Sequence, residues 1–206
     1  MNIEREIKLE LTEDDYLRMR DFLKKNYKTS FVYQHNEIFN LFNITKGVIP
    51  WALRIRKETE DDIVNYIISA KGSARKKTEY ASRIEIEEVL NDSNSILNKN
   101  VLFRVFLSKH GIISEKEKME YFVKTAGKFL NERLIACTNE KGIKEIDLDK
   151  TIFPDNQIDF ELEIEFSESK YYIEIDKFLK KIFKELDIIY KVQSRSKRAR
   201  LMDHLK

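Results

Sequence analysis

The sequence predicts an α+β protein: a closed antiparallel β-barrel with a charged interior and helices packed on its outside. Three observations predict this fold class. Eight segments rich in β-branched and aromatic residues recur along the 206 residues, and several of them carry charged side chains at every second position. Only 5 glycines and 2 prolines occur, which favours long elements and few tight loops.

The predicted strands either alternate apolar with polar residues or are dense in β-forming residues. Asn139 to Gly142 has the composition of a hairpin turn between two of them. The predicted strands span Ile3 to Leu11, Val32 to Phe42, Trp51 to Lys57, Ile63 to Ala70, Tyr80 to Leu90, Phe129 to Thr138, Ile143 to Leu148 and Ile158 to Phe166.

Helices are predicted where apolar residues recur at helical spacing behind a capping residue. Thr12 and Asp15 form a capping box at the first helix, and Ser114 with Glu117 predicts a second box. The predicted helices run from Thr12 to about Lys25, from Leu97 to His110 before Gly111, from Ser169 to Asp187, and over a short basic stretch from about Ser194.

The composition limits the compartment and the class of partner. Charged residues make up 36% of the chain, but the net charge is only +2, so bulk attraction to nucleic acid is not expected. Cys137 is the single cysteine; it favours a reducing, cytoplasmic setting and is expected to be a small buried residue. No secretory signal, membrane-spanning apolar run or glycine-rich phosphate loop is present. Any bound phosphate must therefore be held by side chains.

Charged residues occupy one face of several predicted strands. In the first strand, Glu4, Glu6 and Lys8 share a face opposite Ile7 and Leu9. A half-solvated sheet also alternates, but here carboxylates follow one another on three strands, and like charges across a sheet are destabilising. The same alternation puts on one face Arg54 with Arg56, Arg83 with Glu85 and Glu87, Asp147 with Asp149, and Glu161 with Glu163 and Glu165.

This clustering predicts that the charged faces line the inside of the barrel. The helices would cover the apolar faces from outside, which is the reverse of an ordinary small barrel with an apolar interior. Clustered carboxylates bind hard cations such as Mg²⁺ or Mn²⁺, and arginine and lysine bind phosphate oxygens. A polyphosphate bridged by metal ions would satisfy both sets of charges.

Short charged motifs follow one another in a fixed order between residue 4 and about residue 200. They are Glu4-x-Glu6-x-Lys8, Leu53-Arg54-Ile55-Arg56, Ala70-Lys71-Gly72, Ser82-Arg83-Ile84-Glu85-Ile86-Glu87, Glu163-x-Glu165 and Ser196-Lys197. This series resembles the ExExK, LRIR, [LT]KG, [ST]RxExE, ExE and SK motifs of the CYTH proteins, or triphosphate tunnel metalloenzymes. That family includes class IV adenylate cyclases, thiamine and inorganic triphosphatases, and fungal RNA triphosphatases.

The resemblance implies a triphosphate tunnel formed by residues 1–206 as a single domain, with Mg²⁺ or Mn²⁺ as cofactor and a triphosphate-containing small molecule as partner. It implies a catalytic role for Lys8, in support of either the attack or the leaving group. The implied metal ligands or their close support are Glu4, Glu6, Glu85, Glu87, Asp149, Glu163 and Glu165. The implied triphosphate-binding residues are Arg54, Arg56, Lys71, Arg83, Arg133 and Lys197.

The sequence departs from the family pattern at a few positions. The family often has Lys-x-Arg where this chain has Asn131 and Arg133, so either Lys128 substitutes or one phosphate contact is lost. Ala70 stands before Lys71 where leucine is commoner, and Glu161 is an additional acid.

Metal-dependent triphosphate hydrolysis is the leading functional hypothesis, on inorganic tripolyphosphate or a small organic triphosphate. The alternatives are a cyclase that forms cyclic AMP and diphosphate from ATP, and a module that binds polyphosphate without turnover. No membrane partner is expected, and a homodimer is allowed, although no segment marks an interface. The sequence leaves open the substrate, the choice between Mg²⁺ and Mn²⁺, and the oligomeric state.

Overall fold

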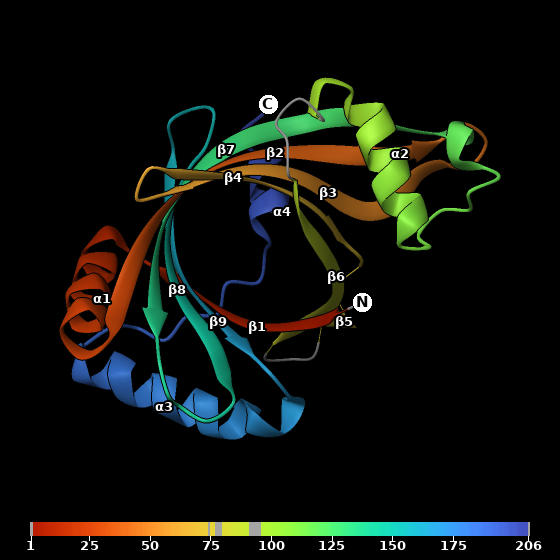
Figure 1. Ribbon diagram of the computed structural model, residues 1–206. Coiled ribbons are helices and arrows are strands. Elements are labelled where there is room, and N and C mark those ends of the chain that lie inside the picture. The colour runs from red at the N-terminus through yellow and green to blue at the C-terminus, as the bar shows by residue number, and fades with distance from the viewer. Residues whose placement is uncertain (1, 74, 77–79, 91–95, 206) are drawn as a thin grey trace.

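The strands of this protein form one closed antiparallel sheet. The computed structural model describes residues 2–73, 75–76, 80–90 and 96–205. Within these ranges the strand order is β1-β9-β8-β7-β2-β3-β4-β6-β5. Because β1 also pairs with β6, every strand except the two-residue β5 belongs to a closed barrel (Figure 1). The predicted fold class is therefore confirmed.

The strands agree with the predicted ones in number and order, apart from β5. The main difference is β7, which begins well before Phe129 because its first half pairs with the second half of β2. The strands are β1 (Asn2–Leu11), β2 (Lys28–Asn43), β3 (Gly47–Glu60), β4 (Ile63–Lys71), β5 (Arg75–Lys76), β6 (Ala81–Leu90), β7 (Tyr121–Cys137), β8 (Ile143–Ile152) and β9 (Ile158–Phe166).

The helices lie where periodicity predicted them. Thr12 and Asp15 form the predicted capping box, and His110 caps the second helix before Gly111, whose φ of 67° is left-handed. The helices are α1 (Glu13–Asn26), α2 (Lys99–Lys109), α3 (Tyr172–Glu185) and α4 (Lys197–Leu201), with 3₁₀ turns at Lys118–Glu120 and Ser169–Tyr171.

Two local predictions are wrong. Ser114 and Glu117 do not open a helix: the Glu117 N–H donates to the Ser114 carbonyl at 3.1 Å in a turn, and a single 3₁₀ turn leads into β7. Cys137 is exposed rather than buried. It is the last residue of β7, where the strand leaves the barrel and the apolar core ends.

Apolar cores separate the barrel from three of its helices. Ile7 and Leu9 of β1 belong to a buried cluster with Met19 of α1 and Leu179 of α3. A second cluster lies beneath α2, on β2, β3, β4 and β6. Figure 1 shows α1 and α3 outside one part of the barrel and α2 outside another. Since the apolar faces are buried outward, the alternate residues of the same strands point inward.

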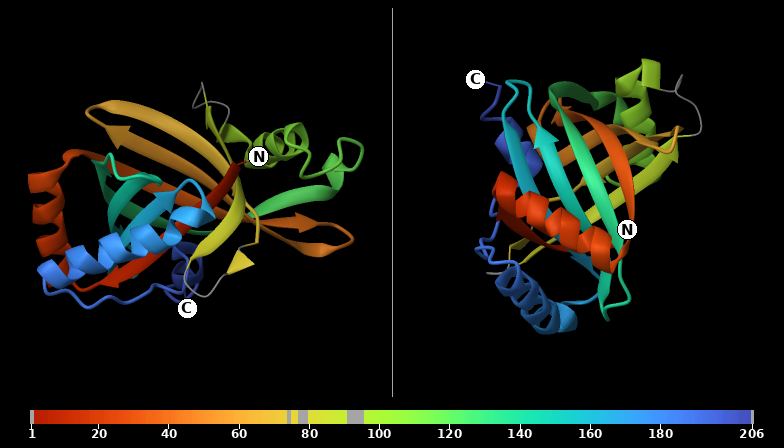
Figure 2. Two further views of the ribbon diagram at one scale, coloured as in Figure 1. Left: turned by 90° about the horizontal axis from the view of Figure 1, so that it is seen from below. Right: turned by 90° about the vertical axis from the view of Figure 1, so that its left-hand side faces the viewer.

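The short helix α4 lies at one end of the barrel (Figure 2). Leu201 packs there against Ile38, Phe129 and Phe153 in a third, smaller cluster. Gly127 of β7 provides the space: a Cβ at this position would lie 2.8 Å from Leu205 Cδ1 and 3.0 Å from Leu201 Cδ2. The missing side chain thus allows the C-terminal segment to dock on the barrel.

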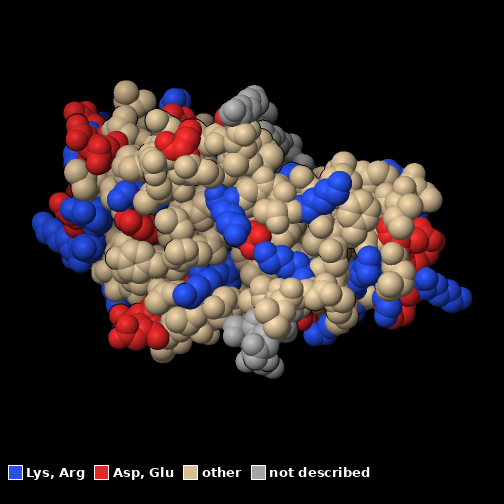
Figure 3. All heavy atoms as spheres, turned by 90° about the horizontal axis from the view of Figure 1, so that it is seen from above, with Lys and Arg blue, Asp and Glu red and all other residues tan. Residues whose placement is uncertain are grey.

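The outer surface carries charges of both signs. On the face shown in Figure 3, basic and acidic side chains are interspersed and form no block of one sign. This distribution agrees with the net charge of +2. Among the described residues, no helix has both the length and the apolar character needed to cross a membrane.

Substitution of Gly127 is expected to loosen the C-terminal segment. Gly127→Ala should lower the free energy of unfolding by roughly 1–2 kcal/mol, as at other overpacked sites. Urea denaturation measures this difference. Gly72→Ala is the matched control, because a Cβ there meets its nearest atom at an ordinary 3.6 Å. Equal stability of the two variants would show that α4 does not depend on Gly127.

The capping box predicts a pH-dependent contribution from Asp15. Burial tends to raise the pKa of Asp15, but hydrogen bonds from Thr12 and Arg18 outweigh burial and lower it. A carboxyl group with a lowered pKa stabilises the folded protein at pH values above its unfolded-state pKa, which is near 4. This stabilisation is lost as the pH falls through the folded-state pKa. Asp15→Asn should therefore lower the unfolding free energy by about 1 kcal/mol at pH 7, and by less near pH 3.

The control for Asp15 is Asp14→Asn, which removes the same charge from an exposed position of the same helical turn. Chemical denaturation at both pH values measures the two differences. An Asp15→Asn effect that does not shrink in acid would rule out this carboxylate as its source.

A charged cavity inside the barrel as the candidate functional site

The barrel encloses a cavity of about 690 Å³. Its wall comes from the inward positions of the strands and from residues 194–199 at the end where α4 lies. Asp149 is fully buried beside the cavity, bonded to three of the lining residues, Asn131, Arg133 and Lys197. The other residues singled out from the sequence all line it: Glu4, Glu6, Lys8, Arg54, Arg56, Lys71, Arg83, Glu85, Glu87, Arg133, Glu163, Glu165 and Lys197.

Glu4 and Glu6 are held by bases from β4 and β6. Arg83 Nε donates to Glu4 Oε2 at 2.6 Å, and Arg83 Nη2 donates to Glu6 Oε1 at 2.9 Å. Lys71 Nζ contacts both Glu4 and Glu85 at 2.9 Å. Burial tends to raise the pKa of Glu4, but Lys71 and Arg83 outweigh burial and hold that pKa well below its usual value. Both glutamates are therefore ionised at neutral pH.

The two arginines of β3 also line the cavity. Arg54 is 3.4 Å from Glu87, and Arg56 is 3.3 Å from Glu58. Burial raises the pKa of Glu85, although Lys71 opposes the effect. The spacing of the LRIR segment thus places two guanidinium groups on the cavity face, as the alternation predicted.

Arg133 joins three carboxylates from two neighbouring strands. Its guanidinium makes a bidentate pair with Asp149 at 2.7 and 2.8 Å and contacts Glu163 at 2.8 Å. It also pairs with Asp147. Burial raises the pKa of Asp147 to about 7, with Arg133 opposing and Asp149 and Glu145 adding to the rise. This wall therefore holds more negative charge than its bases neutralise.

Lys8 lies between the two groups of acids. Its ammonium is 2.9 Å from Glu6 and also bonds to Glu163, so it connects β1 with β9. Burial lowers the pKa of Lys8, with Glu6 opposing the effect. A lysine with a lowered pKa can exchange a proton more readily near neutral pH than an exposed one.

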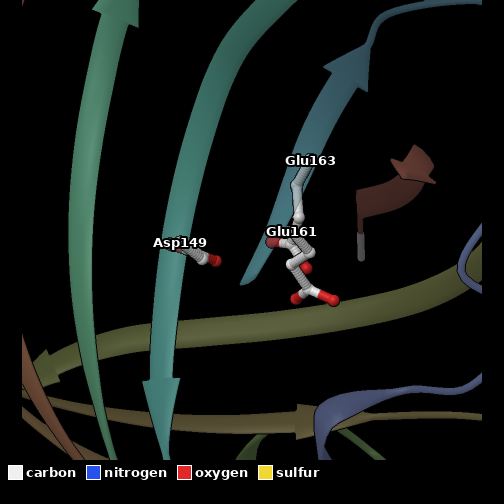
Figure 4. A group of neighbouring side chains, drawn as sticks. All are labelled: Asp149, Glu161 and Glu163. Atoms are coloured by element: carbon white, nitrogen blue, oxygen red, sulfur yellow. The ribbon is translucent and has the colours of Figure 1, made fainter. Parts of the chain in front are cut away.

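Asp149, Glu161 and Glu163 turn toward one another from β8 and β9 (Figure 4). Their carboxylate oxygens lie within 4.8 Å of one another. Lys197 Nζ bonds to all three, at 2.7 Å to Asp149 and 2.9 Å to Glu163. In this structure the lysine ammonium therefore supplies the cation that the three acids surround.

Glu161 is a buried residue whose role the sequence motifs did not assign. It is fully buried and bonds to Lys197 and to Arg200, which also contacts Asp159 at 2.8 Å. The sequence signal for this residue is its place as the third acid in the β9 alternation, next to Glu163 and Glu165. Glu161 connects α4 to the barrel and so positions Lys197.

The structure resolves the question raised by Asn131. The Lys128 side chain is 70% exposed and faces Glu37 at 3.8 Å, so it does not substitute within the cavity. Asn131 Nδ2 donates to Asp149 Oδ1 at 2.9 Å, and Thr151 donates to Asn131 at 2.8 Å. A neutral buried amide thus orients Asp149 where the family often has a lysine.

The lining residues fit a hard divalent cation. The cavity presents carboxylate oxygens and, among its described lining residues, no histidine or cysteine, which is the donor set that Mg²⁺ and Mn²⁺ prefer. Asp147 Oδ1 is buried and has no hydrogen-bond partner within the described part of the chain. An unpartnered acceptor in an acidic cluster is what a bound cation would satisfy.

Comparison with solved structures finds the same fold in several proteins. HpAC1 from Hippeastrum, proposed to be an adenylyl cyclase and described as having a dominant triphosphatase activity, is 21% identical; the match covers 97% of this chain and 95% of that chain, with a TM-score of 0.74. The PH1819 protein of Pyrococcus horikoshii is also 21% identical, covering 96% and 98%, with a TM-score of 0.64. The mimivirus capping enzyme triphosphatase is 14% identical, covering 93% and 90%, with a TM-score of 0.56.

No protein-family model and no curated protein sequence matches this chain. The similarities to solved structures, by contrast, confirm the tunnel-barrel fold expected from the charged motifs. At identities of 21% or less, these similarities establish the fold alone.

Removal of the Asp147 charge should stabilise the metal-free protein at alkaline pH. A carboxyl group whose pKa is raised by folding does not destabilise the protein at pH values below its unfolded-state pKa, where it is protonated in both states. As the pH rises from there toward the folded-state pKa of about 7, the folded protein loses stability relative to the unfolded chain. The rise from 3.8 to about 7 corresponds to at most about 4 kcal/mol. Asp147→Asn should therefore exceed wild type in unfolding free energy at pH 8, in chelator, and approach it near pH 4.

The control for Asp147 is Glu117→Gln, since Glu117 is exposed and lies outside the cavity. Urea denaturation at both pH values measures the effect. An Asp147→Asn variant that is less stable than wild type at pH 8 would show that Arg133 fully compensates the buried charge.

Proposed function

We propose that this protein hydrolyses a triphosphate inside the barrel with the help of divalent metal ions, and that residues 1–206 act as one tunnel domain. A single observation carries the proposal: the closed barrel turns acids and bases from seven strands and α4 into one cavity. The negative oxygens of a ligand can replace the carboxylates as partners of the bases, and its metal ions can replace the bases as partners of the carboxylates.

The bases would bind the phosphate chain. Arg54 and Arg56 approach from β3, and Arg83 and Lys71 from β6 and β4. Arg133 and Lys197 face them from β7 and α4. Arginine can hold a phosphate through two parallel hydrogen bonds. Bases on opposite walls would keep the chain extended and would stabilise the charge that develops on the departing diphosphate.

The acids would hold the metal. Glu6 and Glu163 meet around Lys8, Glu4 lies two positions before Glu6 on β1, and Glu85 with Glu87 extends the acidic surface along β6. Glu165 lies at the rim, bonded to Lys144 at 2.7 Å, and supports this set. Asp149 is fully paired with Arg133 and Lys197, so we assign it a supporting role. When bound, Mg²⁺ or Mn²⁺ acidifies a water and polarises phosphoryl oxygens.

Lys8 is the residue we assign to proton transfer or leaving-group support. The reaction breaks one P–O–P bond, adds the water oxygen to phosphorus and releases a proton. Lys8 is buried between Glu6 and Glu163, and burial lowers its pKa. A neutral fraction of Lys8 that grows with pH would favour activity at alkaline pH.

A cyclase remains the second candidate because two structural relatives favour it. HpAC1 was proposed to be an adenylyl cyclase, as was a Vibrio parahaemolyticus protein 11% identical to this chain, with a TM-score of 0.55 and 96% coverage of both chains. The triphosphatase activity described for HpAC1 favours hydrolysis for the present cavity. The third candidate, binding without turnover, rests on Asn131 in place of a lysine.

The test is phosphate release from tripolyphosphate, ATP and thiamine triphosphate in Mg²⁺ or Mn²⁺, with cyclic AMP assayed in the ATP reaction. The Glu4→Gln, Glu6→Gln double variant should lose phosphate release by roughly a hundredfold or more, because the metal loses two ligands. Calorimetry should show weaker Mn²⁺ binding by the same variant.

The matched control is Glu13→Gln, Glu117→Gln, which removes two exposed charges that do not line the cavity. Cyclic AMP without phosphate release would identify a cyclase, and tight binding without turnover would identify a binding module. Full activity in the Glu4, Glu6 variant would overturn the assignment of the metal ligands.

A further inference from the structure

One base of the cavity differs from all the others. The predicted phosphate-binding residues each have a carboxylate partner, as does Arg195, which contacts Asp203 at 2.5 Å. Arg198 also lines the cavity. No carboxylate lies within ion-pair distance of Arg198 in the part of the chain that the structure describes, so its positive charge is not neutralised by the protein.

The hydrogen bonds of Arg198 are incomplete as well. Its Nη2 donates to Asn40 Oδ1 at 2.6 Å, and Asn40 is a neutral amide on β2. Its Nε is buried and has no partner among the described residues. A buried N–H without an acceptor costs free energy, and a guanidinium with free donors is a preferred partner of phosphate oxygens.

Asn40 also orients the guanidinium toward the cavity. It lies on β2 opposite Ala52 of β3, which is itself a lining residue, and two positions beyond Ile38. The lining residues Ile38, Ala52 and Phe129 are uncharged here, and the nearest charged neighbour in register with Ala52 is Lys71 of β4, which is already paired with Glu4 and Glu85. A phosphate group here would face the Arg198 guanidinium, which has no carboxylate within ion-pair distance in the described part of the chain.

The position of Arg198 is fixed by the rest of α4. Leu201 packs on Phe129 and Phe153, and Arg200 bonds to Asp159 and Glu161. Both anchors leave the Arg198 side chain on the cavity side. A base that is held in place and not neutralised loses little conformational freedom when a ligand binds.

We infer that Arg198, oriented by Asn40, forms a phosphate subsite at the α4 end of the cavity, separate from the acid-paired bases. The inference rests on the proposed function, because the ligand would be one phosphate group of the bound triphosphate. The subsite would select for phosphate groups at this end by charge and by the free Nε donor. No metal ligand takes part in it.

Two variants test the subsite with tripolyphosphate as the probe. Arg198→Met should raise KM and weaken calorimetric binding by roughly tenfold or more, with a smaller change in kcat, because a charge-assisted hydrogen bond is lost. Arg198→Lys should recover part of the affinity. Arg20→Met, at a surface ion pair of α1, is the matched control and should equal wild type.

Asn40→Asp separates binding from structure. A carboxylate at this position would pair with Arg198, which would strengthen the attachment of α4 but neutralise the cation. A phosphate subsite therefore predicts weaker tripolyphosphate binding at unchanged or higher melting temperature. If Arg198 only stabilises the fold, the Asn40→Asp variant should bind tripolyphosphate as tightly as wild type does. This variant keeps the side-chain volume and decides the question even if Arg198→Met unfolds.

The outcomes distinguish the two proposals. If wild type neither binds nor hydrolyses any triphosphate, the proposed function fails and the subsite with it. If wild type binds and turns over tripolyphosphate and both Arg198→Met and Asn40→Asp match it, only the subsite is overturned. Weaker binding in both variants, with the Arg20 control unchanged, supports the subsite.

Discussion

The pairing of buried charges across neighbouring strands is the constraint on which the rest of this structure depends. A buried charge without a partner costs several kcal/mol, and removal of one partner leaves the other exposed to that cost. Glu4 faces Arg83 in the register between β1 and β6, and the two strands are the ones that close the barrel. The pairing of β1 with β6 therefore closes the barrel and also brings Glu4 and Arg83 of the site into contact.

This constraint also determines how the side chains that line the cavity are held in position. Internal ion pairs hold each side chain in place, which pre-organises the donors and acceptors. In the proposed function, a triphosphate and its metal ions would exchange partners with these pairs: oxygens of the substrate would replace carboxylates as partners of the bases, and metal cations would replace lysine and arginine as partners of the acids. Asp147 has a raised pKa and an oxygen without a hydrogen-bond partner among the residues that the structure describes, so the internal pairing is incomplete there.

The short C-terminal segment contributes both to the packing of the barrel and to the charged cavity. Lys197 bonds to acids of both β8 and β9, and Arg200 joins Glu161 to α4. Gly127 leaves the space in which Leu201 packs. The segment thus stabilises one end of the barrel and also adds bases to the cavity. These two tasks are compatible because the first residues of α4, Lys197 and Arg198, line the cavity, whereas Arg200 and Leu201 contact the barrel wall.

By itself, the sequence determined the strands, the inward face and the set of acids and bases, because side-chain alternation is a local property of each strand. The period of two places Glu4, Glu6 and Lys8 on one face whatever the neighbours are. Tertiary structure alone decided the partners: Lys197 meets Asp149 across 48 positions, and Lys128 turns outward although it lies near Asn131. Those contacts depend on barrel closure and register, which bring distant residues together and which no local period encodes.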